Sequence, residues 1–188
     1  MMTAPLDAAE AGLLIARALE TEGIPHALGG ALALGAHGVP RGTLDVDVNV
    51  FVADDQLGTV IRCLLGIGVE IEETPALAQA RRDGMFVGRW AGMRIDVFVP
   101  SIPFSSEAGR TRVQLEGSEG EAVWFLSAEA LSVFKLLFFR PKDIADLERL
   151  VAVQGDALDH AYVRRWIVDM MGDEDDRARI WDELCARF

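Results

Sequence analysis

Residues 43–52 alternate apolar and polar side chains almost without exception, and this pattern constrains the fold more than any other part of the chain. Successive side chains of a β-strand point to opposite faces, so the alternation predicts a strand with one apolar and one polar face. The core face would hold Leu44, Val46, Val48 and Val50, and the polar face Asp45, Asp47 and Asn49. The chain is therefore expected to contain a strand with acidic side chains on one side.

Hydrophobic periodicity and turn residues predict the remaining elements. Helices are expected at residues 6–22, 31–36, 54–65, 128–139, 143–153, 159–171 and 173–188. Strands are expected near His26 and at residues 69–71, 85–90, 93–99 and 112–115, while residues 74–82 are interpreted as a loop or short helix. Ala91-Gly92 separates two of these strands by two residues, which predicts a hairpin. Ser127 is expected to cap the helix that follows it. A chain of 188 residues has room for one domain, or for one with a short extension.

Eighteen Lys and Arg against 30 Asp and Glu give a net charge of −12. This charge disfavours long nucleic acid and favours cationic partners. The cysteines, Cys63 and Cys185, lack metal-type spacing and are interpreted as packing residues in a reducing cytoplasm. Residues 1–10 show no secretory pattern, and the uncharged run 23–40 contains five glycines and two prolines, so no membrane segment is expected.

Asp45 and Asp47 stand two residues apart on one strand face, about 7 Å from each other, which is close enough to bind one hydrated cation. Asp96 is also flanked by strand-forming residues, and if the two strands are neighbours, three acids meet. Crowded carboxylates need a compensating cation, and oxygen ligands select Mg²⁺ or Mn²⁺. The alternative is that these acids simply face solvent from a half-exposed strand.

Gly29-Gly30 precedes the short helix predicted at residues 31–36. Glycines let the backbone approach a phosphate, and amides at a helix start stabilise its charge. A plain turn is the other interpretation of the pair. The position of the glycine pair, fifteen residues before the acidic strand, favours the phosphate site.

The Gly29-Gly30 pair, the Arg41-x-Thr43 lead-in and Asp45-x-Asp47 together closely resemble the nucleotidyltransferase superfamily, which has the DNA polymerase β-like fold. Many members of that superfamily have Ser in place of Gly30. The Arg-x-Thr lead-in is similar to toxin-type and uncharacterised bacterial branches such as the AbiEii-like group. Residues 134–147, with a helical Lys followed by Arg, Lys-Asp and Asp-Leu, are similar to a second motif of those branches. The resemblance covers residues 25–150.

This resemblance implies an α+β fold: a nucleotidyltransferase core at residues 1–125, with a mixed sheet flanked by helices, and a helical C-terminal part at 126–188. It implies a metal-dependent enzyme that moves a nucleoside monophosphate from an NTP such as ATP to a hydroxyl and releases pyrophosphate. The catalytic and metal-binding residues would be Asp45, Asp47 and Asp96, with Asp96 activating the hydroxyl. The nucleotide-binding residues would be Gly29, Gly30, Arg41, Thr43, Lys135, Lys142 and Asp143.

Several of these residues have a second interpretation. Lys135 would reach a phosphate or order the site, but it is equally compatible with a surface lysine whose stem lies along apolar neighbours. Asp143, like Asp146, would fix a neighbouring basic side chain or cap the next helix. Arg41 and Thr43 would contact a phosphate, orient a carboxylate or serve the loop. His26 and His37 are interpreted as structural, with the cleft as the alternative.

Three acceptors are compatible with the sequence: a tRNA end, a protein hydroxyl and a small cationic aminocyclitol. The net charge favours the small molecule or the protein. An RNA acceptor would need a basic patch, for which the mid-chain candidates are Arg81, Arg82, Arg89, Arg110 and Arg112.

A different class of function is a binding module, such as an antitoxin or regulator, or a degenerate enzyme that has lost turnover. Large apolar side chains in the C-terminal helices would then hold a partner protein or a second copy, or else cover the domain's own core. These side chains are Tyr162, Trp166, Ile180, Trp181 and Leu184.

Overall fold

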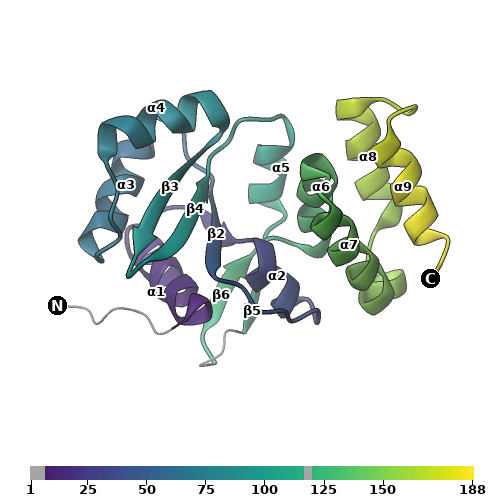
Figure 1. Ribbon diagram of the computed structural model, residues 1–188, viewed down its shortest axis with the longest axis horizontal. Helices are drawn as coiled ribbons and strands as arrows, with labels where there is room; N and C mark the ends of the chain where they lie inside the picture. The colour runs from purple at the N-terminus through teal and green to yellow at the C-terminus, as the bar shows by residue number, and fades with distance from the viewer. Residues whose placement is uncertain (1–6, 117–119) are drawn as a thin grey trace.

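A computed structural model describes residues 7–116 and 120–188. These residues form one six-stranded mixed sheet with helices on both faces, and a group of helices at the C-terminal end (Figure 1). The architecture is α+β, as the sequence predicts. Within the described ranges, no helix combines the length and apolar character that a membrane crossing needs.

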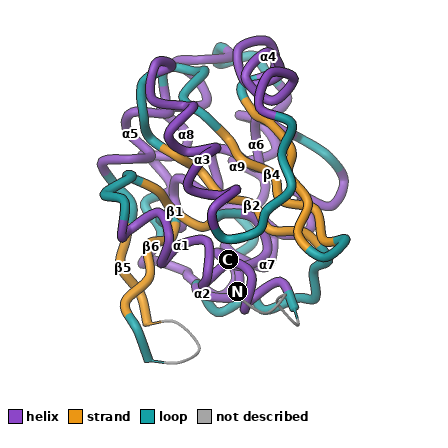
Figure 2. Tube along the Cα trace, turned by 90° about the vertical axis from the view of Figure 1, so that its left-hand side faces the viewer, coloured by secondary structure: helices purple, strands orange, loops and turns teal. Residues whose placement is uncertain are grey.

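The sheet brings together segments that are far apart in the sequence. Its strands lie in the order β3-β4-β2-β1-β6-β5, with β3 and β5 at opposite edges. Figure 2 shows β4, β2, β1, β6 and β5 in this succession. β2 runs parallel to β4, and β1 parallel to β6, while the other pairs are antiparallel. The bounds are β1 His26–Leu28, β2 Asp45–Val50, β3 Met85–Trp90, β4 Met93–Phe98, β5 Val113–Glu116 and β6 Ala122–Phe125.

The helices form two layers and a C-terminal group. α1 packs on one face of the sheet and contacts α3, which in turn contacts α4, while α2 and α6 lie on the other face. α7, α8 and α9 surround α6 at the end of the molecule (Figure 1). The bounds are α1 Ala8–Thr21, α2 Gly30–Ala36, α3 Leu57–Gly66, α4 Glu73–Asp83, α5 Phe104–Arg110, α6 Ala128–Phe138, α7 Pro141–Gln154, α8 His160–Met171 and α9 Asp176–Cys185, with 3-10 turns at Asp54–Gln56 and Gly155–Ala157.

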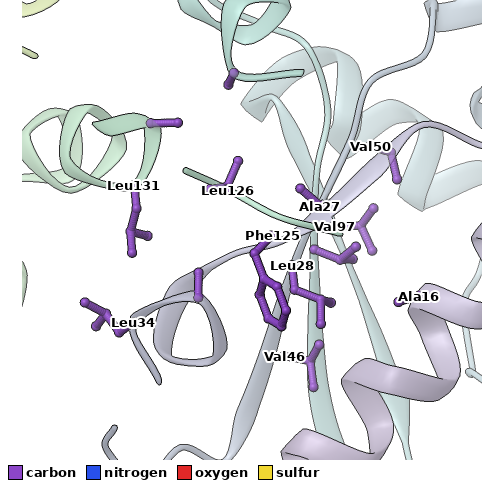
Figure 3. Close-up of a cluster of buried hydrophobic side chains, with 14 of the residues drawn as sticks. Ala16, Ala27, Leu28, Leu34, Val46, Val50, Val97, Phe125, Leu126 and Leu131 are labelled. Atoms are coloured by element: carbon purple, nitrogen blue, oxygen red, sulfur yellow. The ribbon is translucent and has the colours of Figure 1, made fainter. Parts of the chain in front are cut away.

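The alternation in β2 separates the core from the functional face. Val46, Val48 and Val50 are buried on the side of the sheet that α1 covers, where Ala16 lies beside Val97 of the next strand (Figure 3). The acidic residues of β2 therefore point to the opposite face, toward α2 and α6. Leu44 is an exception to the prediction: it precedes the strand and is 89% exposed, so it does not belong to the core.

Local signals locate several helix ends and turns. The Ser127 side chain accepts a hydrogen bond from the Ala130 amide, which confirms it as the N-cap of α6. The hairpin β3–β4 is also confirmed, and both of its turn residues, Ala91 and Gly92, have positive φ, as a two-residue turn between twisted strands requires.

Other predictions were wrong or incomplete. Residues 69–71, predicted as a strand, form only an isolated bridge, between Glu70 and Arg89. Residues 74–82, left open between a loop and a short helix, belong to helix α4, which confirms the helical alternative. Helix α5 and strand β6 were not predicted. Both are short: α5 follows a proline-rich turn, and β6 has only four residues, so their periodicity is too brief to detect.

Candidate active site

The acids of the two predicted strands meet because β2 and β4 are neighbours. The parallel register places Asp47 directly beside Asp96 and Asp45 beside Arg94. The carboxylates of Asp45 and Asp47 share a face of β2, and Asp96 extends the group across the strand boundary. The structure thus brings all three predicted acids to one place on the sheet.

Two of the three carboxylates are held by other side chains. Thr43 Oγ1 donates a hydrogen bond to Asp45 Oδ1. Arg94 Nε donates to Asp96 Oδ1 at 2.8 Å. Among the described residues, no three His, Cys, Asp or Glu side chains converge tightly enough to hold a metal ion together. The contacts show that Asp45 is turned toward Thr43 and Asp96 toward the guanidinium of Arg94.

The electrostatics of Asp47 indicate a site that is short of positive charge. The pKa of Asp47 is raised to about 6, first by burial and then by the charges of Asp45 and Asp96, against the smaller opposing effect of Lys135 and Lys142. A cation between the carboxylates would relieve this repulsion. The donors are all hard oxygens, so the residues present fit Mg²⁺ or Mn²⁺.

Gly29 and Gly30 lie directly against the acidic strand. The Gly29 amide donates to the Asp47 carbonyl oxygen at 2.9 Å. Gly30, the first residue of α2, has φ +52°, and a Cβ there would lie 1.8 Å from Asp47 Oδ2. The glycine pair is therefore needed for the position of Asp47, in addition to any role in approaching a phosphate.

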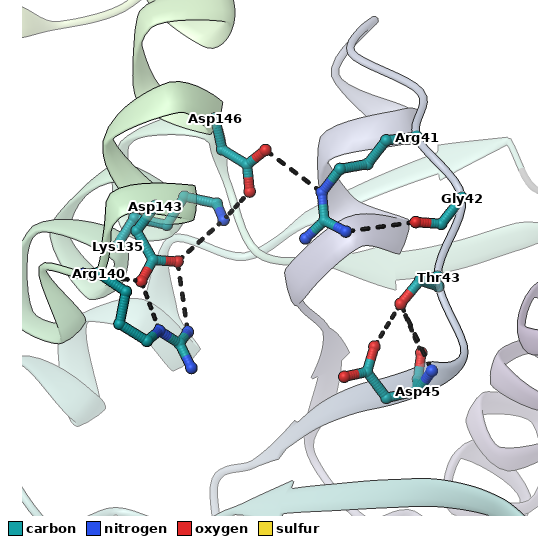
Figure 4. A network of polar contacts seen from close by, with 8 residues as sticks. All are labelled: Arg41, Gly42, Thr43, Asp45, Lys135, Arg140, Asp143 and Asp146. Atoms are coloured by element: carbon teal, nitrogen blue, oxygen red, sulfur yellow. Dashed lines mark hydrogen bonds and ion pairs between the residues drawn. The ribbon is translucent and has the colours of Figure 1, made fainter.

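Lys135 lies inside the molecule and is not a surface lysine. It is 5% exposed, and its Nζ lies 2.7 Å from Asp146 Oδ2 and 3.5 Å from Asp143 Oδ1 (Figure 4). Asp146 Oδ1 also pairs with Arg41 Nε at 3.2 Å. These contacts join α6 and α7 to the loop before β2, which carries Thr43 and so reaches Asp45.

Asp143 is the third residue of α7, whose N-cap is Arg140, so the prediction of Asp143 as an N-cap is wrong. Its Oδ2 accepts hydrogen bonds from Arg140 Nε at 2.6 Å and from the Arg140 amide at 3.2 Å. Burial works to raise the pKa of Asp143, but the Arg140 hydrogen bond and the Lys135 charge outweigh it, and the pKa is lowered. Asp143 thereby holds Arg140 at the edge of the site.

A cleft of about 690 Å³ lies between the acidic face of the sheet and helices α6 and α7. Its acidic side chains come from the sheet and from the start of α7, while three of its five basic side chains come from α6, α7 and the residue that caps α7. The basic side chains that line it are Arg41, Arg94, Lys135, Arg140 and Lys142. Four of these five cations are paired with carboxylates: Arg41 with Asp146, Arg94 with Asp96, Lys135 with Asp143 and Asp146, and Arg140 with Asp143. In a chain of net charge −12, their gathering beside exposed Lys142 still makes the cleft suited to a polyanion that also touches the acids through a divalent ion.

His26 and His37 have structural partners and do not line the cleft. His26 is buried, burial lowers its pKa, and its Nδ1 lies 2.8 Å from the Ile24 carbonyl oxygen. His37 Nε2 lies 2.8 Å from the Leu126 carbonyl oxygen. Neither is among the residues that line the cleft.

The basic patch considered for an RNA acceptor is largely compensated. Arg81 pairs with Asp54, Arg82 with its neighbour Asp83, and Arg110 with Glu107. Arg112 stacks over the ring of Trp124.

The large apolar side chains of the C-terminal helices pack inside the chain. Trp181 and Leu184 are almost fully buried, and Tyr162, Trp166 and Ile180 pack against the same core. Packing within the chain accounts for all five, which removes them as an argument for a partner or dimer surface.

Sequence reasoning missed Arg94 and the aromatic wall of the cleft. Arg94 stands two residues before Asp96 on the same strand face, and this spacing is a signal from which the contact was predictable. The wall consists of Phe98 from β4 and Phe134 and Phe138 from α6. No local pattern indicates that these three rings line one cavity.

The sequence matches no known family model and no curated protein. Solved structures do resemble the fold. A nucleotidyltransferase-like protein from Paracoccidioides brasiliensis is 18% identical, with 94% of each chain covered and a TM-score of 0.56. The antibiotic-resistance factor ANT(2'')-Ia is 17% identical over 83% of this chain and 91% of its own, with a TM-score of 0.54. The lincosamide antibiotic adenylyltransferase LnuA, solved with lincomycin, is 16% identical over 78% of this chain and 99% of its own, also with a TM-score of 0.54.

These likenesses establish the class of fold. The six-stranded mixed sheet with its flanking helices is a nucleotidyltransferase-type fold, as the resemblance of the sequence implied. At identities below 20%, they define the architecture and leave the chemistry to be argued from the residues of the cleft.

Proposed function

We propose that this chain is a metal-dependent nucleotidyltransferase that moves a nucleoside monophosphate from an NTP, such as ATP, to a hydroxyl acceptor and releases pyrophosphate. One observation carries the proposal: Asp47 and Asp96 lie side by side on neighbouring strands, with Asp45 on the same face, beneath a wall of basic side chains. Acids alone would suit a cation, and bases alone an anion. Their combination suits a nucleotide bound together with its metal.

Asp45, Asp47 and Asp96 would hold Mg²⁺ or Mn²⁺. When bound, the ion neutralises phosphate charge and lowers the pKa of the attacking hydroxyl. The raised pKa of Asp47 supports this assignment, since its causes after burial are the two neighbouring carboxylates. Arg94 would have to release Asp96, at least in part, as the ion binds.

The other residues position the nucleotide. Helix α2 begins at Gly30 beside Asp47, so the amides of its first turn would donate to phosphate oxygens. Gly29, whose own amide already donates to the Asp47 carbonyl oxygen, would serve by letting the backbone come close to the phosphates. Lys142 is exposed at the cleft and would contact the triphosphate directly. Lys135, held by two buried carboxylates, would order the helical wall and add a fixed positive charge.

The remaining predicted residues would orient the acids and hold the edge of the cleft in place. Thr43 would fix the direction of the Asp45 carboxylate, and Arg41 would hold its loop against α7 through Asp146. Asp143 would act through Arg140, which it anchors at the rim.

In the reaction, the acceptor oxygen forms a bond to the α-phosphorus as the bond from that phosphorus to the β-bridging oxygen breaks. The pyrophosphate leaves with the electron pair. The hydroxyl proton would pass to a carboxylate oxygen of Asp96 that Arg94 has released. Charge neutralisation and positioning supply most of the rate.

The branch of the superfamily, the division of the chain and the cellular location are also part of the proposal. The Arg41-x-Thr43 lead-in and the motif around Lys135 support membership of the AbiEii-like branch and a place in a toxin–antitoxin pair. The core at residues 1–125 would supply the acids and the part at 126–188 most of the cations. The free cysteines Cys63 and Cys185 support action in the cytoplasm.

The acceptor is proposed to be a small molecule in preference to a tRNA or a protein. ANT(2'')-Ia is an antibiotic-resistance factor and LnuA a lincosamide adenylyltransferase, which supports this choice by analogy of fold. The local pairing of Arg81, Arg82 and Arg110 also argues against an RNA surface.

Asp47→Asn tests the mechanism. With NTP, Mg²⁺ and a panel of small hydroxyl acceptors present, we expect pyrophosphate release to fall by about two orders of magnitude or more, because a metal ligand is lost while the side-chain shape is kept. Asp55→Asn, on an exposed turn, is the matched control and should retain full activity. Undiminished turnover in Asp47→Asn eliminates this mechanism. Nucleotide binding by the wild type without any pyrophosphate release would favour the binding module or the degenerate enzyme.

A further inference from the structure

We propose that an apolar pocket beside the cleft receives the acceptor, and that the acceptor is an uncharged small molecule whose hydroxyl is attached to a compact aromatic or hydrocarbon body. This inference rests on the proposed function. It assigns an uncharged acceptor, whereas the net charge alone favours a cationic one. The pocket has a volume of about 250 Å³. It lies where β2 and β4 end and β3 begins, under helix α6.

The pocket and the cleft are continuous. They share the side chains of Asn49, Met85, Phe98, Phe134 and Phe138 as lining. Phe98 and Phe138 contact each other, with ring centroids 5.8 Å apart. A molecule seated in the pocket would therefore lie against the aromatic wall and extend into the site of the three acids.

The chemistry of the pocket selects an apolar occupant. Beyond the shared wall, its lining is mainly apolar and includes Val99, Ile102 and Leu137. Its acidic side chain, Asp83, already receives two hydrogen bonds from Arg82, and no basic side chain belongs to its described lining. A cation placed here would lose hydration without gaining a free partner, which is costly.

One buried hydroxyl offers a polar contact at the far end. Ser105 is 6% exposed, and its Oγ accepts from the amides of Ser101 and Ile102 at 3.3 and 3.4 Å. The hydroxyl can still donate its own hydrogen to a ligand oxygen. An apolar body with one ether, carbonyl or hydroxyl oxygen would satisfy it.

The position of the pocket matches the entering side of the reaction. An in-line displacement needs the attacking oxygen and the leaving pyrophosphate on opposite sides of the phosphorus. The glycine cradle follows β1, on one side of β2, whereas Asp96 belongs to β4, on the other side. Phe98 lies two residues beyond Asp96 on the same strand face, about 7 Å away. An acceptor in the pocket would thus present its hydroxyl to Asp96 from the side opposite the cradle.

The test measures two ligands separately on the full chain. Calorimetry with Mg²⁺ and a non-cleavable ATP analogue, α,β-methylene-ATP, reports nucleotide binding. Naphthalene-2-methanol, added to that complex, reports the pocket. Ile102→Trp and, as a second variant, Leu137→Trp narrow the pocket at positions that do not line the cleft. Leu65→Trp, an exposed position on α3, is the matched control.

We expect the alcohol to bind the wild type and Leu65→Trp equally, and to bind each pocket variant more weakly by about tenfold or more. Nucleotide affinity should stay within about twofold throughout. With ATP and Mg²⁺, mass spectrometry should show one nucleoside monophosphate added to naphthalene-2-methanol and none to the cationic aminocyclitol 2-deoxystreptamine.

Three results would overturn the assignment. Equal alcohol binding in all variants shows that the pocket is not used. A parallel loss of nucleotide affinity in Ile102→Trp and Leu137→Trp shows that the pocket receives the base of the NTP. Transfer to the aminocyclitol alone shows that the acceptor is cationic. Failure of the wild type to bind the nucleotide analogue is a different outcome: it refutes the proposed function, and the acceptor assignment with it.

Discussion

Gly30→Ala should lower the free energy of unfolding, and the loss can be worked out in two parts. The first part is the backbone: Gly30 has φ +52°, and an alanine in the left-handed region costs about 1–2 kcal/mol. The second part is contact. The new Cβ would lie 1.8 Å from Asp47 Oδ2 and 2.6 Å from Asp47 Cγ, so the carboxylate has to move. Overpacking of this kind costs about 1–3 kcal/mol.

Gly23→Ala separates the two parts. Gly23 has a similar φ of +65°, but a Cβ there would meet no atom within 4 Å. This control should therefore lose only the backbone part, about 1–2 kcal/mol, which lowers Tm by about 2–4 °C per kcal/mol in a chain of this size. The difference between the two variants measures the cost of moving Asp47.

Activity provides the second comparison. A catalytic group misplaced by about 1 Å costs on the order of 10²-fold in rate, so pyrophosphate release should fall by about that factor in Gly30→Ala and stay unchanged in Gly23→Ala. Urea unfolding and pyrophosphate-release kinetics on both variants are the assays. The reasoning is refuted if the two variants lose the same stability, or if Gly30→Ala turns over at the wild-type rate.

Two further predictions concern the cations of the cleft. Lys135→Met should lower the free energy of unfolding by about 3–5 kcal/mol, because it removes the buried cation that Asp143 and Asp146 share and leaves each of them with a single arginine partner. Lys142→Met, at an exposed position, should change the free energy of unfolding by less than about 0.5 kcal/mol, and equal losses in urea unfolding would contradict this. Arg94→Ala should strengthen Mn²⁺ binding several-fold in calorimetry, because the ion no longer displaces a guanidinium from Asp96. Arg89→Ala removes the same charge from the neighbouring strand and should have little effect, so a similar gain in both variants would show that only net charge matters.

Much of the site was predictable because its signals are local. Alternation along β2 depends on residues that follow one another, so it predicted which side chains share a face. The same holds for the hairpin at Ala91-Gly92 and for the Ser127 cap. Leu44 shows the limit of such reasoning: it fits the alternation, yet the strand begins one residue later, and the side chain is exposed.

The partners of each side chain were decided over longer distances. Sequence could place Asp96 on a strand, but not show that this strand lies beside β2 with Asp96 next to Asp47. The sequence did not decide whether Lys135 lies on the surface or in the interior, because a lysine in an apolar helix is compatible with both positions. The contact with Asp146 of the next helix decides it.

By itself, then, the sequence determined the residue types, the acidic face of the strand and the resemblance to a nucleotidyltransferase. Only the tertiary structure decided that β2 and β4 are neighbours, that the glycine pair makes room for Asp47, and that an aromatic wall extends the cleft into an apolar pocket. The physical reason is range: periodicity is set by neighbouring residues along the chain, whereas a site is made by contacts between segments that meet only when the core packs.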